Sequence, residues 1–302
     1  MAAHAPSAPA LACVLLAHSD PAHVHRLIAS LAPFPVFLHC DVKASDDVFA
    51  DMTRELPDRV TVQDRLRTGW ARWENVAAEI EGYRAALATT DASHIGVFTG
   101  SDYPLVSTHE VSRRLAEIEG RSVAYMHTFP HPHWGRSGGY DRLRYPHWPI
   151  AKRMLRLPVP RKKPRGLVFA GGSQLKVLAR HHAEAVVRAY DENPAIVDFW
   201  KRSWIADETF VPTILSTPRF VPDWAETHIQ DSFWWIRWGD SRTKSPSWLG
   251  LDDLEALLSR TLYDDQTSKS VFARKFSTEH STAVLDAIDA AIARSSAPAE
   301  EM

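Results

Sequence analysis

Residues 11–41, LACVLLAHSDPAHVHRLIASLAPFPVFLHCD, contain two apolar runs separated by an amphipathic segment. The first run, Leu11–Ala17, is continuously apolar, which is typical of a parallel strand buried on both faces. Asp20 is a residue type favoured at a helix N-cap, and Pro21 suits the first helical position. The second run covers residues 36–40. This order predicts a strand–helix–strand unit with parallel strands and a right-handed crossover.

The same alternation of apolar runs and helical periodicity continues along the chain. It predicts an α/β protein with a Rossmann-type, mostly parallel sheet flanked by helices. We expect one domain over residues 11–294, with flexible ends at 1–10 and 295–302. Further strands are predicted at 59–62, 95–99, 122–126, 167–170, 219–221 and 233–238, and helices at 74–88, after a Ser107–Glu110 capping box, at 180–190, after Asp207, and around Val284–Ile292.

The composition excludes several classes of protein. The formal net charge of −2 lacks the basic excess of a nucleic-acid-binding protein. The N-terminus lacks the features of a signal peptide, and no apolar run reaches the ~18 residues of a membrane span. Cys13 and Cys40 lie in predicted strands, where we expect buried, reduced thiols. We therefore predict a cytoplasmic protein with no nucleic-acid partner and no membrane span.

Two further regions have an unusual composition. Residues 152–165 are basic and interrupted by prolines, which predicts a loop that is either simply solvated or an anion-binding lid. Residues 128–166 as a whole show no clear period, and long irregular stretches inside compact domains are often functional. We therefore assign this stretch to acceptor contact, through Trp134, Tyr140, Arg142, Arg144 and Trp148.

The chain lacks the usual signatures of phosphate and metal binding. It contains neither a glycine-rich phosphate motif nor an Asp-x-Asp pair, which many sugar-nucleotide enzymes use to hold a divalent metal. The charge of a diphosphate leaving group must then be neutralised by Lys or Arg. Arg274 and Lys275 are candidates, because Phe272 and Phe276 on either side can anchor the segment. The basic residues Arg237, Arg242 and Lys244 follow the strand predicted at 233–238.

A carboxylate candidate lies at Glu208. Pro212 cannot tolerate a helical carbonyl four residues earlier, so Glu208 should lie at the very start of the following helix or just outside it, with Asp207 as a cap. A glutamate there either projects into a crevice or stabilises the helix dipole. His127, His131 and His133 lack the spacing and partners of a standard metal site, so no metal is predicted there.

The first two predicted strands end next to polar residues. His18 and Asp41 follow these strands and should face one crevice, because ligands of open α/β sheets bind beyond the carboxyl ends of the strands. Asp41 either hydrogen-bonds a nucleotide or caps a turn, and its position alone leaves both interpretations open.

Several segments, taken in order, resemble one family. The chain is similar to the core-2/I-branching β-1,6-N-acetylglucosaminyltransferases, family 14 of the glycosyltransferases, which also contains the peptide O-xylosyltransferases. The similarity spans roughly residues 11–277, although Leu175 replaces an aromatic residue and Ser245–Ser247 replaces a His-Pro-Lys segment. The matching segments are residues 14–18 (VLLAH), 37–43 (FLHCDVK), 69–72 (GWAR), 99–105 (TGSDYPL), 172–174 (GSQ), 206–208 (ADE) and 272–276 (FARKF).

The resemblance implies a GT-A-like fold and a metal-independent transfer that inverts the anomeric centre of a UDP-sugar, either UDP-N-acetylglucosamine or UDP-xylose. It implies that Glu208 is the general base, that Lys275 contacts the diphosphate and that Asp41 lies near the uridine. This sequence lacks the N-terminal membrane anchor and the disulfide cysteines of the animal members. In this respect it resembles a soluble, bacterial-type member of the family. Further expected site residues are His18, Arg274 and either Arg242 or Lys244 for the nucleotide, and Ser101, Asp102, Tyr103, Asp207 and Trp238 for donor or acceptor.

Two other functions are compatible with these residues. One is a metal-dependent glycosyltransferase with a disguised metal site. The other is a non-catalytic protein that binds a carbohydrate or a nucleotide, including a regulator that binds phosphate ligands through the basic loop. We expect no cofactor besides the donor, and a carbohydrate or glycoconjugate as acceptor.

Overall fold

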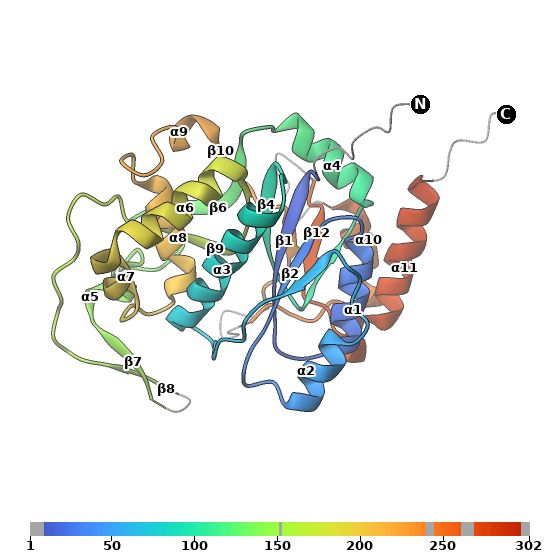
Figure 1. The fold of residues 1–302 in the computed structure, drawn as a ribbon, viewed down its shortest axis with the longest axis horizontal. Coiled ribbons are helices and arrows are strands. Elements are labelled where there is room, and N and C mark those ends of the chain that lie inside the picture. Colours follow the sequence, from blue (N-terminus) through green and yellow to red (C-terminus); the bar gives the residue numbers. More distant parts are fainter. Residues whose placement is uncertain (1–8, 151–152, 240–244, 261–268, 297–302) are drawn as a thin grey trace.

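The computed structural model describes residues 9–150, 153–239, 245–260 and 269–296. At its centre is a seven-stranded sheet in the order β10-β6-β9-β4-β1-β2-β3 (Figure 1). All neighbouring strands are parallel except that β9 runs antiparallel to both β4 and β6. The predicted α/β class with a mostly parallel sheet is confirmed. The strands are β1 (Leu11–Ala17), β2 (Val36–Cys40), β3 (Val60–Val62), β4 (His94–Thr99), β6 (Ser122–Thr128), β9 (Ala170–Ala179) and β10 (His228–Ile229).

Both faces of the sheet are buried, which explains the continuous apolar run of β1. Successive side chains of a strand point to opposite faces. Leu11 and Leu15 pack towards one set of helices, and Ala12 and Val14 towards another. The first set is α1 (Pro21–Ser30), α4 (Thr108–Glu117), α10 (Leu254–Ser259) and α11 (Thr278–Ser296), and the second is α3 (Trp73–Thr89), α6 (Arg180–Glu192), α7 (Pro194–Trp200) and α8 (Phe210–Ser216).

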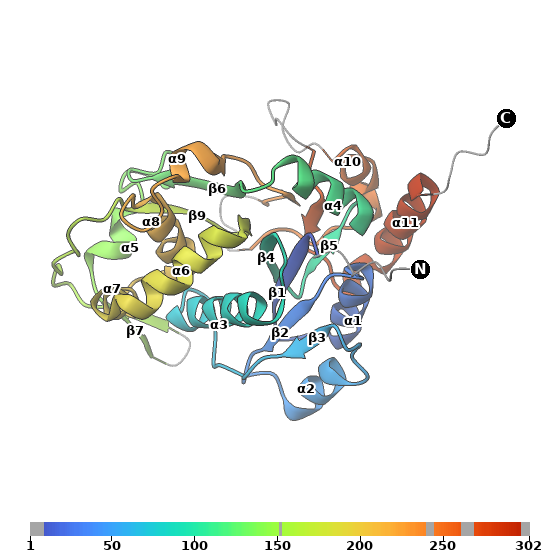
Figure 2. The ribbon, with the colours of Figure 1, turned by 45° about the horizontal axis from the view of Figure 1, so that its top comes forward.

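Figure 2 shows the two groups of helices on either side of the sheet, with α2 (Asp46–Thr53) beyond β3. Cys13 and Cys40 are buried and unpaired, as predicted. Within the described ranges, no helix combines the length and apolar character needed to cross a membrane.

A second, three-stranded sheet joins distant parts of the chain. It has the order β11-β12-β5, formed by β11 (Trp234–Ile236), β12 (Phe272–Arg274) and β5 (Asp102–Pro104). Phe98 of β4 contacts Trp234 and Phe272, with ring centroids 5.2 and 4.8 Å away. This aromatic contact fixes the FARKF segment against the end of the central sheet.

Three predicted strands need correction. The strand expected at 167–170 begins only at Ala170 and continues to Ala179, through a Gly-Gly-Ser-Gln stretch that does not resemble a strand. Glycine is required there, since a Cβ on Gly172 would lie 2.2 Å from the carbonyl oxygen of Tyr125 on β6. Residues 219–221 form a turn, closed by the carbonyl of Thr217, and the strand expected at 233–238 is limited to β11.

The helix caps agree with the sequence in part. Asp20 caps α1, accepting a hydrogen bond from the amide of His23 (3.2 Å), as predicted. Ser107 caps α4 in the same way, but the Glu110 carboxylate pairs with Arg113 and Arg114 instead of completing a capping box.

The segment predicted as irregular contains a short helix and a hairpin. These are α5 (Tyr140–Arg144) and the strands β7 (His147–Ile150) and β8 (Arg153–Arg156). Within the basic stretch predicted as a loop at 152–165, residues 153–156 therefore form a strand, and the chain is irregular after residue 156. The domain boundary stays a prediction, and the chain ends predicted to be flexible lie largely outside the described residues.

Candidate active site

The carboxyl ends of three parallel strands meet at one edge of the sheet. Ala17 of β1 is opposite Cys40 of β2, and Leu16 is opposite Thr99 of β4. The residues that follow these strands, His18, Asp41 and Ser101, are therefore brought to the same edge, as expected. In open α/β sheets this is the edge at which ligands bind.

Asp41 is buried and organises the loop at 65–69. Its carboxylate accepts hydrogen bonds from the amide of Lys43 (2.7 Å) and from the hydroxyl of Thr68 (2.5 Å). Arg65 donates to the carbonyl of Asp41 (3.0 Å). Of the two interpretations of Asp41, the structural one is realised, and contact with a nucleotide stays a prediction.

The same loop connects Asp41 to the candidate base. Gly69 follows Thr68, and its carbonyl accepts a hydrogen bond from the side-chain amide of Asn75 (3.0 Å). The Asn75 amide also donates to Oδ2 of Asp207 (3.1 Å). Asn75 was not predicted as a site residue. The only sequence feature that could have indicated it was its position in the first turn of α3. Through Asn75, the loop beside Asp41 and the segment that holds Glu208 form one hydrogen-bonded unit.

Asp207 does not cap a helix, contrary to the prediction. It lies within the 3₁₀ helix η1 (Ala206–Glu208), and its side chain is turned inward. Its Oδ1 has no hydrogen-bond partner among the described residues. Burial, together with the adjacent charge of Glu208, raises the pKa of Asp207 to about 7. Asp207 therefore carries a proton part of the time at neutral pH.

Glu208 lies where Pro212 predicted it, at the last residue of η1 and just outside α8. Its side chain is 34% exposed, and Oε2 forms an ion pair with the guanidinium of Arg142. That guanidinium lies over the ring of Trp134, 3.4 Å from the centroid. The short helix α5 thus supplies the cation that orients the candidate base.

Lys275 directly follows β12 and contacts Ser245 and Trp248. Its Nζ donates to the hydroxyl of Ser245 (2.7 Å) and lies 4.0 Å from the ring centroid of Trp248. Partial burial, together with the nearby charge of Arg274, lowers the pKa of Lys275. Trp248 also lines a pocket of about 480 Å³, together with Ser19, Asp20, Ser101, Ser277, Thr278, Glu279 and His280.

Arg274 points the other way, to a buried carboxylate. It pairs with Oδ1 of Asp102 (3.1 Å), which also accepts from the Thr99 hydroxyl (2.8 Å). Oδ2 of Asp102 accepts from the Thr99 amide (2.9 Å) and from the indole of Trp234 (3.1 Å). Asp102 is completely buried, so the expectation that it contacts a sugar is wrong. Arg274 joins the two sheets and is not directed to a diphosphate.

Tyr103 is likewise a core residue. It is 1% exposed, and its hydroxyl donates to Asp289 (2.8 Å) and accepts from Arg26 (3.3 Å). Its predicted contact with donor or acceptor is corrected in the same way. Within the GSDYP stretch, Ser101 is the member that lines the pocket.

Replacing Arg274 by alanine is expected to destabilise the fold. The Asp102 carboxylate would lose its cation but keep the Thr99 and Trp234 donors, so we expect a loss of about 2–3 kcal/mol. Urea denaturation followed by tryptophan fluorescence measures the free energy of unfolding. Replacing the exposed Arg219 by alanine is the control, and equal stability of both variants would contradict the structural role of Arg274.

The remaining predicted site residues are either accessible in the structure or lie outside the described part of the chain. His18 is exposed at the end of β1, and Trp238 is exposed (59%) beyond β11, so both side chains are accessible. Arg242 and Lys244 lie outside the described residues.

The histidines at 127, 131 and 133 form a cluster in which the rings of His127 and His131 are 4.8 Å apart.

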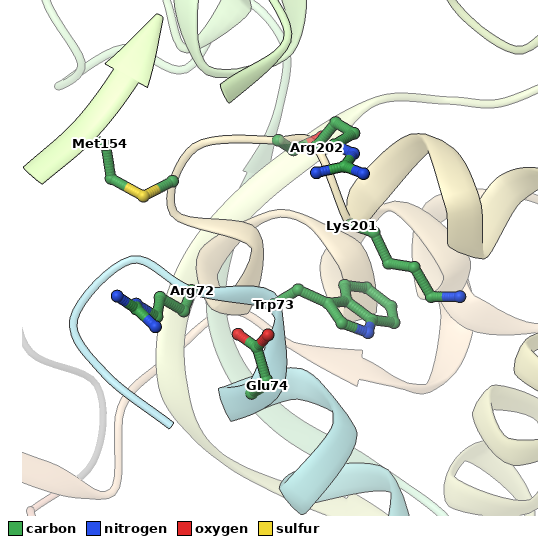
Figure 3. Close-up of a pocket in the computed structure, with 7 residues that line it drawn as sticks. Arg72, Trp73, Glu74, Met154, Lys201 and Arg202 are labelled. Carbon is green, nitrogen blue, oxygen red and sulfur yellow. The ribbon is translucent and has the colours of Figure 1, made fainter. Parts of the chain in front are cut away.

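A second pocket, of about 280 Å³, lies where α3 begins. It is lined by Arg72, Trp73, Glu74, Met154, Lys201, Arg202 and Ser203. Figure 3 shows the indole of Trp73 in the middle of this group, with Lys201 and Arg202 above it and Glu74 below it. Arg202 also lies over the ring of Trp148, 4.8 Å from its centroid. The α3 start, β8 and the segment leading into η1 thus enclose a basic and aromatic pocket.

One protein-family model matches this chain. The family model described as "Branch: Core-2/I-Branching enzyme" matches residues 31–258, well over half of the 302-residue chain. No curated protein matches the chain.

Solved structures give only distant similarity. HddC from Yersinia pseudotuberculosis is 12% identical with a TM-score of 0.29, over 57% of this chain and 79% of that one. A putative glucose-1-phosphate thymidylyltransferase from Bacillus anthracis, solved in complex with a sucrose, is 10% identical with a TM-score of 0.28, over 63% of this chain and 81% of that one.

Proposed function

The chain belongs to the Core-2/I-branching enzyme family, whose members are glycosyltransferases, and we propose that it transfers a sugar from a UDP-sugar to a hydroxyl of a carbohydrate or glycoconjugate. We propose further that the transfer inverts the anomeric centre and requires no metal ion. The observation that carries this proposal is the contact of Lys275 with Trp248, because the Trp248 side chain lines the pocket at the carboxyl edge of the sheet. A fixed cation there supplies the charge that a metal ion supplies in other transferases.

The proposed mechanism is a single in-line displacement. The carboxylate of Glu208 accepts the proton of the acceptor hydroxyl while that oxygen forms a bond to C1 of the sugar. The bond between C1 and the diphosphate oxygen breaks, and its electron pair leaves with UDP. Lys275 stabilises the negative charge that develops on the leaving diphosphate. Because Arg142 contacts Oε2 of Glu208, we assign Oε1 to the proton transfer.

The acceptor is assigned to the pocket at the start of α3. Ser203 on its wall is only a few residues before Glu208 in the chain, and Trp148 lies next to Arg202 at its rim. Flat indole faces suit sugar rings, and guanidinium groups suit hydroxyl and carboxylate oxygens. The stretch around 128–166 contributes Met154 to the wall of this pocket and Trp148 beside Arg202, in line with its proposed role in acceptor contact.

A thermal-shift panel tests the donor assignment. We expect UDP-N-acetylglucosamine or UDP-xylose to raise the melting temperature, because a ligand at 100 times its Kd adds about 2.7 kcal/mol to folding stability. GDP-mannose is the control nucleotide sugar. If no uridine nucleotide stabilises the protein, the donor assignment is wrong.

Chelation tests the metal-free mechanism. We expect turnover, measured as UDP release in the presence of acceptor, to be unchanged by EDTA, because no step of the mechanism uses a metal ion. The shift produced by the donor should also be the same with and without EDTA. Loss of turnover that added Mn²⁺ restores would indicate a metal-dependent transferase. Binding of donor with no turnover for any acceptor would indicate a non-catalytic binding protein.

A further inference from the structure

A group of imidazole and carboxylate side chains lies at the opposite edge of the sheet from the candidate active site. His181 and His182 are in the first turn of α6, directly after Ala179, the last residue of β9. Ala179 is paired with His94 at the start of β4, so α6 begins at the amino ends of the parallel strands. Asp223 immediately precedes α9 (Trp224–Thr227), which lies above α6 in Figure 1.

The three side chains converge on one point. Nε2 of His181 lies 3.2 Å from Oδ2 of Asp223, and Nε2 of His182 lies 3.6 Å from Oδ1 of the same carboxylate. One ligand atom from each residue lies within 4.8 Å of the other two. Bonds of about 2.0–2.2 Å to a tetrahedral zinc ion place ligand atoms about 3.4 Å apart, so closure needs only a small movement of the exposed His181.

From this convergence we propose that His181, His182 and Asp223 bind a divalent transition-metal ion, with Zn²⁺ as the best match. Two imidazole nitrogens and one carboxylate oxygen form a set that suits Zn²⁺ and excludes Mg²⁺ and Ca²⁺, which prefer oxygen ligands. Three protein ligands leave a fourth position for water. His181 and Asp223 have 46% and 40% of their side chains exposed, so an ion can enter from solvent.

The surroundings of His182 suit a metal ligand. This side chain is completely buried. Its Nδ1 lies 2.7 Å from the hydroxyl oxygen of Ser122, which also accepts a hydrogen bond from the Ala179 amide (2.8 Å).

Metal binding requires one tautomer of His182. Without an ion, Nε2 lies 3.2 Å from the hydroxyl of Thr227, which donates to the Asp223 carbonyl, so Nε2 carries the proton. With an ion bound, the proton moves to Nδ1 and is donated to Ser122, whose oxygen has a second acceptor position. Ser122 therefore acts as the outer hydrogen-bond partner that metal-bound histidines usually have.

The remaining nearby histidine is already engaged. His228 donates a hydrogen bond from Nε2 to the Ala124 carbonyl (2.7 Å) and stacks on Trp224, with centroids 4.5 Å apart. A bound ion would link α6, through His181 and His182, to the start of α9, through Asp223. The edge strand β10 follows α9 directly. Its expected effect is on the stability of this edge, and sugar transfer at the other edge does not depend on it.

Isothermal titration calorimetry with ZnCl₂ tests the site on the untagged full chain after dialysis against EDTA and then against metal-free buffer. We expect one Zn²⁺ per chain and a higher melting temperature in its presence. The His181→Ala and Asp223→Asn variants should each bind at least about tenfold more weakly. Both residues are partly exposed, so these variants are expected to fold, and circular dichroism verifies this. His133→Ala is the matched control, because His133 belongs to the other histidine cluster.

Retention of binding in His133→Ala, together with its loss in the other two variants, would support the site. Absence of saturable Zn²⁺ binding would overturn the proposal, and so would binding that persists in Asp223→Asn or disappears in His133→Ala. None of these outcomes bears on the donor and acceptor assignments, because UDP release is measured separately in His181→Ala and Asp223→Asn and should equal that of the unchanged chain in both.

Discussion

Replacing Glu208 by glutamine is expected to lower kcat by about 10²–10⁴, because the acceptor hydroxyl would lose its general base. Glutamine keeps the size of the side chain and can still hydrogen-bond, so the position of η1 should not change. Turnover is measured as UDP release at saturating donor and acceptor. Donor-induced thermal shifts should be the same in the variant and the unchanged chain.

One further variant at position 208 separates the effect of the negative charge from the effect of side-chain length, and a second variant serves as a control. Glu208→Asp keeps the carboxylate but withdraws it by one methylene, and its turnover should fall between those of the glutamine variant and the unchanged chain. Glu192→Gln, at the exposed end of α6, is the matched control and should be fully active. Near-normal turnover of a folded Glu208→Gln enzyme would show that another group takes the proton.

The position of Glu208 was predictable because its cause is local. Pro212 restricts the backbone four residues earlier, and no distant contact changes that restriction. The partner of Glu208 was not predictable, because Arg142 comes from a segment 66 positions away that has no periodic pattern. Local sequence thus placed the carboxylate, whereas the cation that orients it depends on tertiary packing.

The first two strands were predictable from the sequence, and β9 was not. β1 and β2 are buried on both faces, so their sequences are almost entirely apolar and easily recognised. β9 is also buried, but Gly171 and Gly172 are required by the close approach of Trp134 and Tyr125. Those neighbours are distant in the sequence, so the glycines suggested a loop where the structure has a strand.

The sequence could not show which of the two adjacent cations, Arg274 or Lys275, belongs to the site. The sequence indicated two adjacent cations between two anchoring phenylalanines, and both phenylalanines are indeed buried. Arg274 is the last residue of β12 and is paired with Asp102 of β5, whereas Lys275 follows the strand and contacts Trp248. Which of the two cations is held by Asp102 depends on the register of β12 against β5. That register is set by pairing with a distant strand, so the sequence left both cations as candidates.

Replacing Lys275 by alanine is expected to lower kcat/KM by about 10²–10³, the usual effect of removing one group that stabilises developing negative charge. The fold should be unaffected, because the backbone carbonyl of Lys275, which accepts a hydrogen bond from Leu249, stays in place. Lys269→Ala, at an exposed residue shortly before β12, is the matched control. Undiminished kcat/KM in a folded Lys275→Ala variant would contradict the proposed role.

The pH dependence of kcat/KM distinguishes a cation at position 275 from a side chain that merely fills space. Burial and Arg274 lower the pKa of Lys275 below its ordinary value of 10.5. As the pH rises through this lowered pKa, the ammonium loses its proton and kcat/KM should fall. Arginine stays charged over the whole range, so Lys275→Arg should remove this alkaline decrease even where its turnover at pH 7 is reduced. An unchanged alkaline limb in Lys275→Arg would assign the decrease to another group, since only the charge at position 275 differs in this respect between the two enzymes.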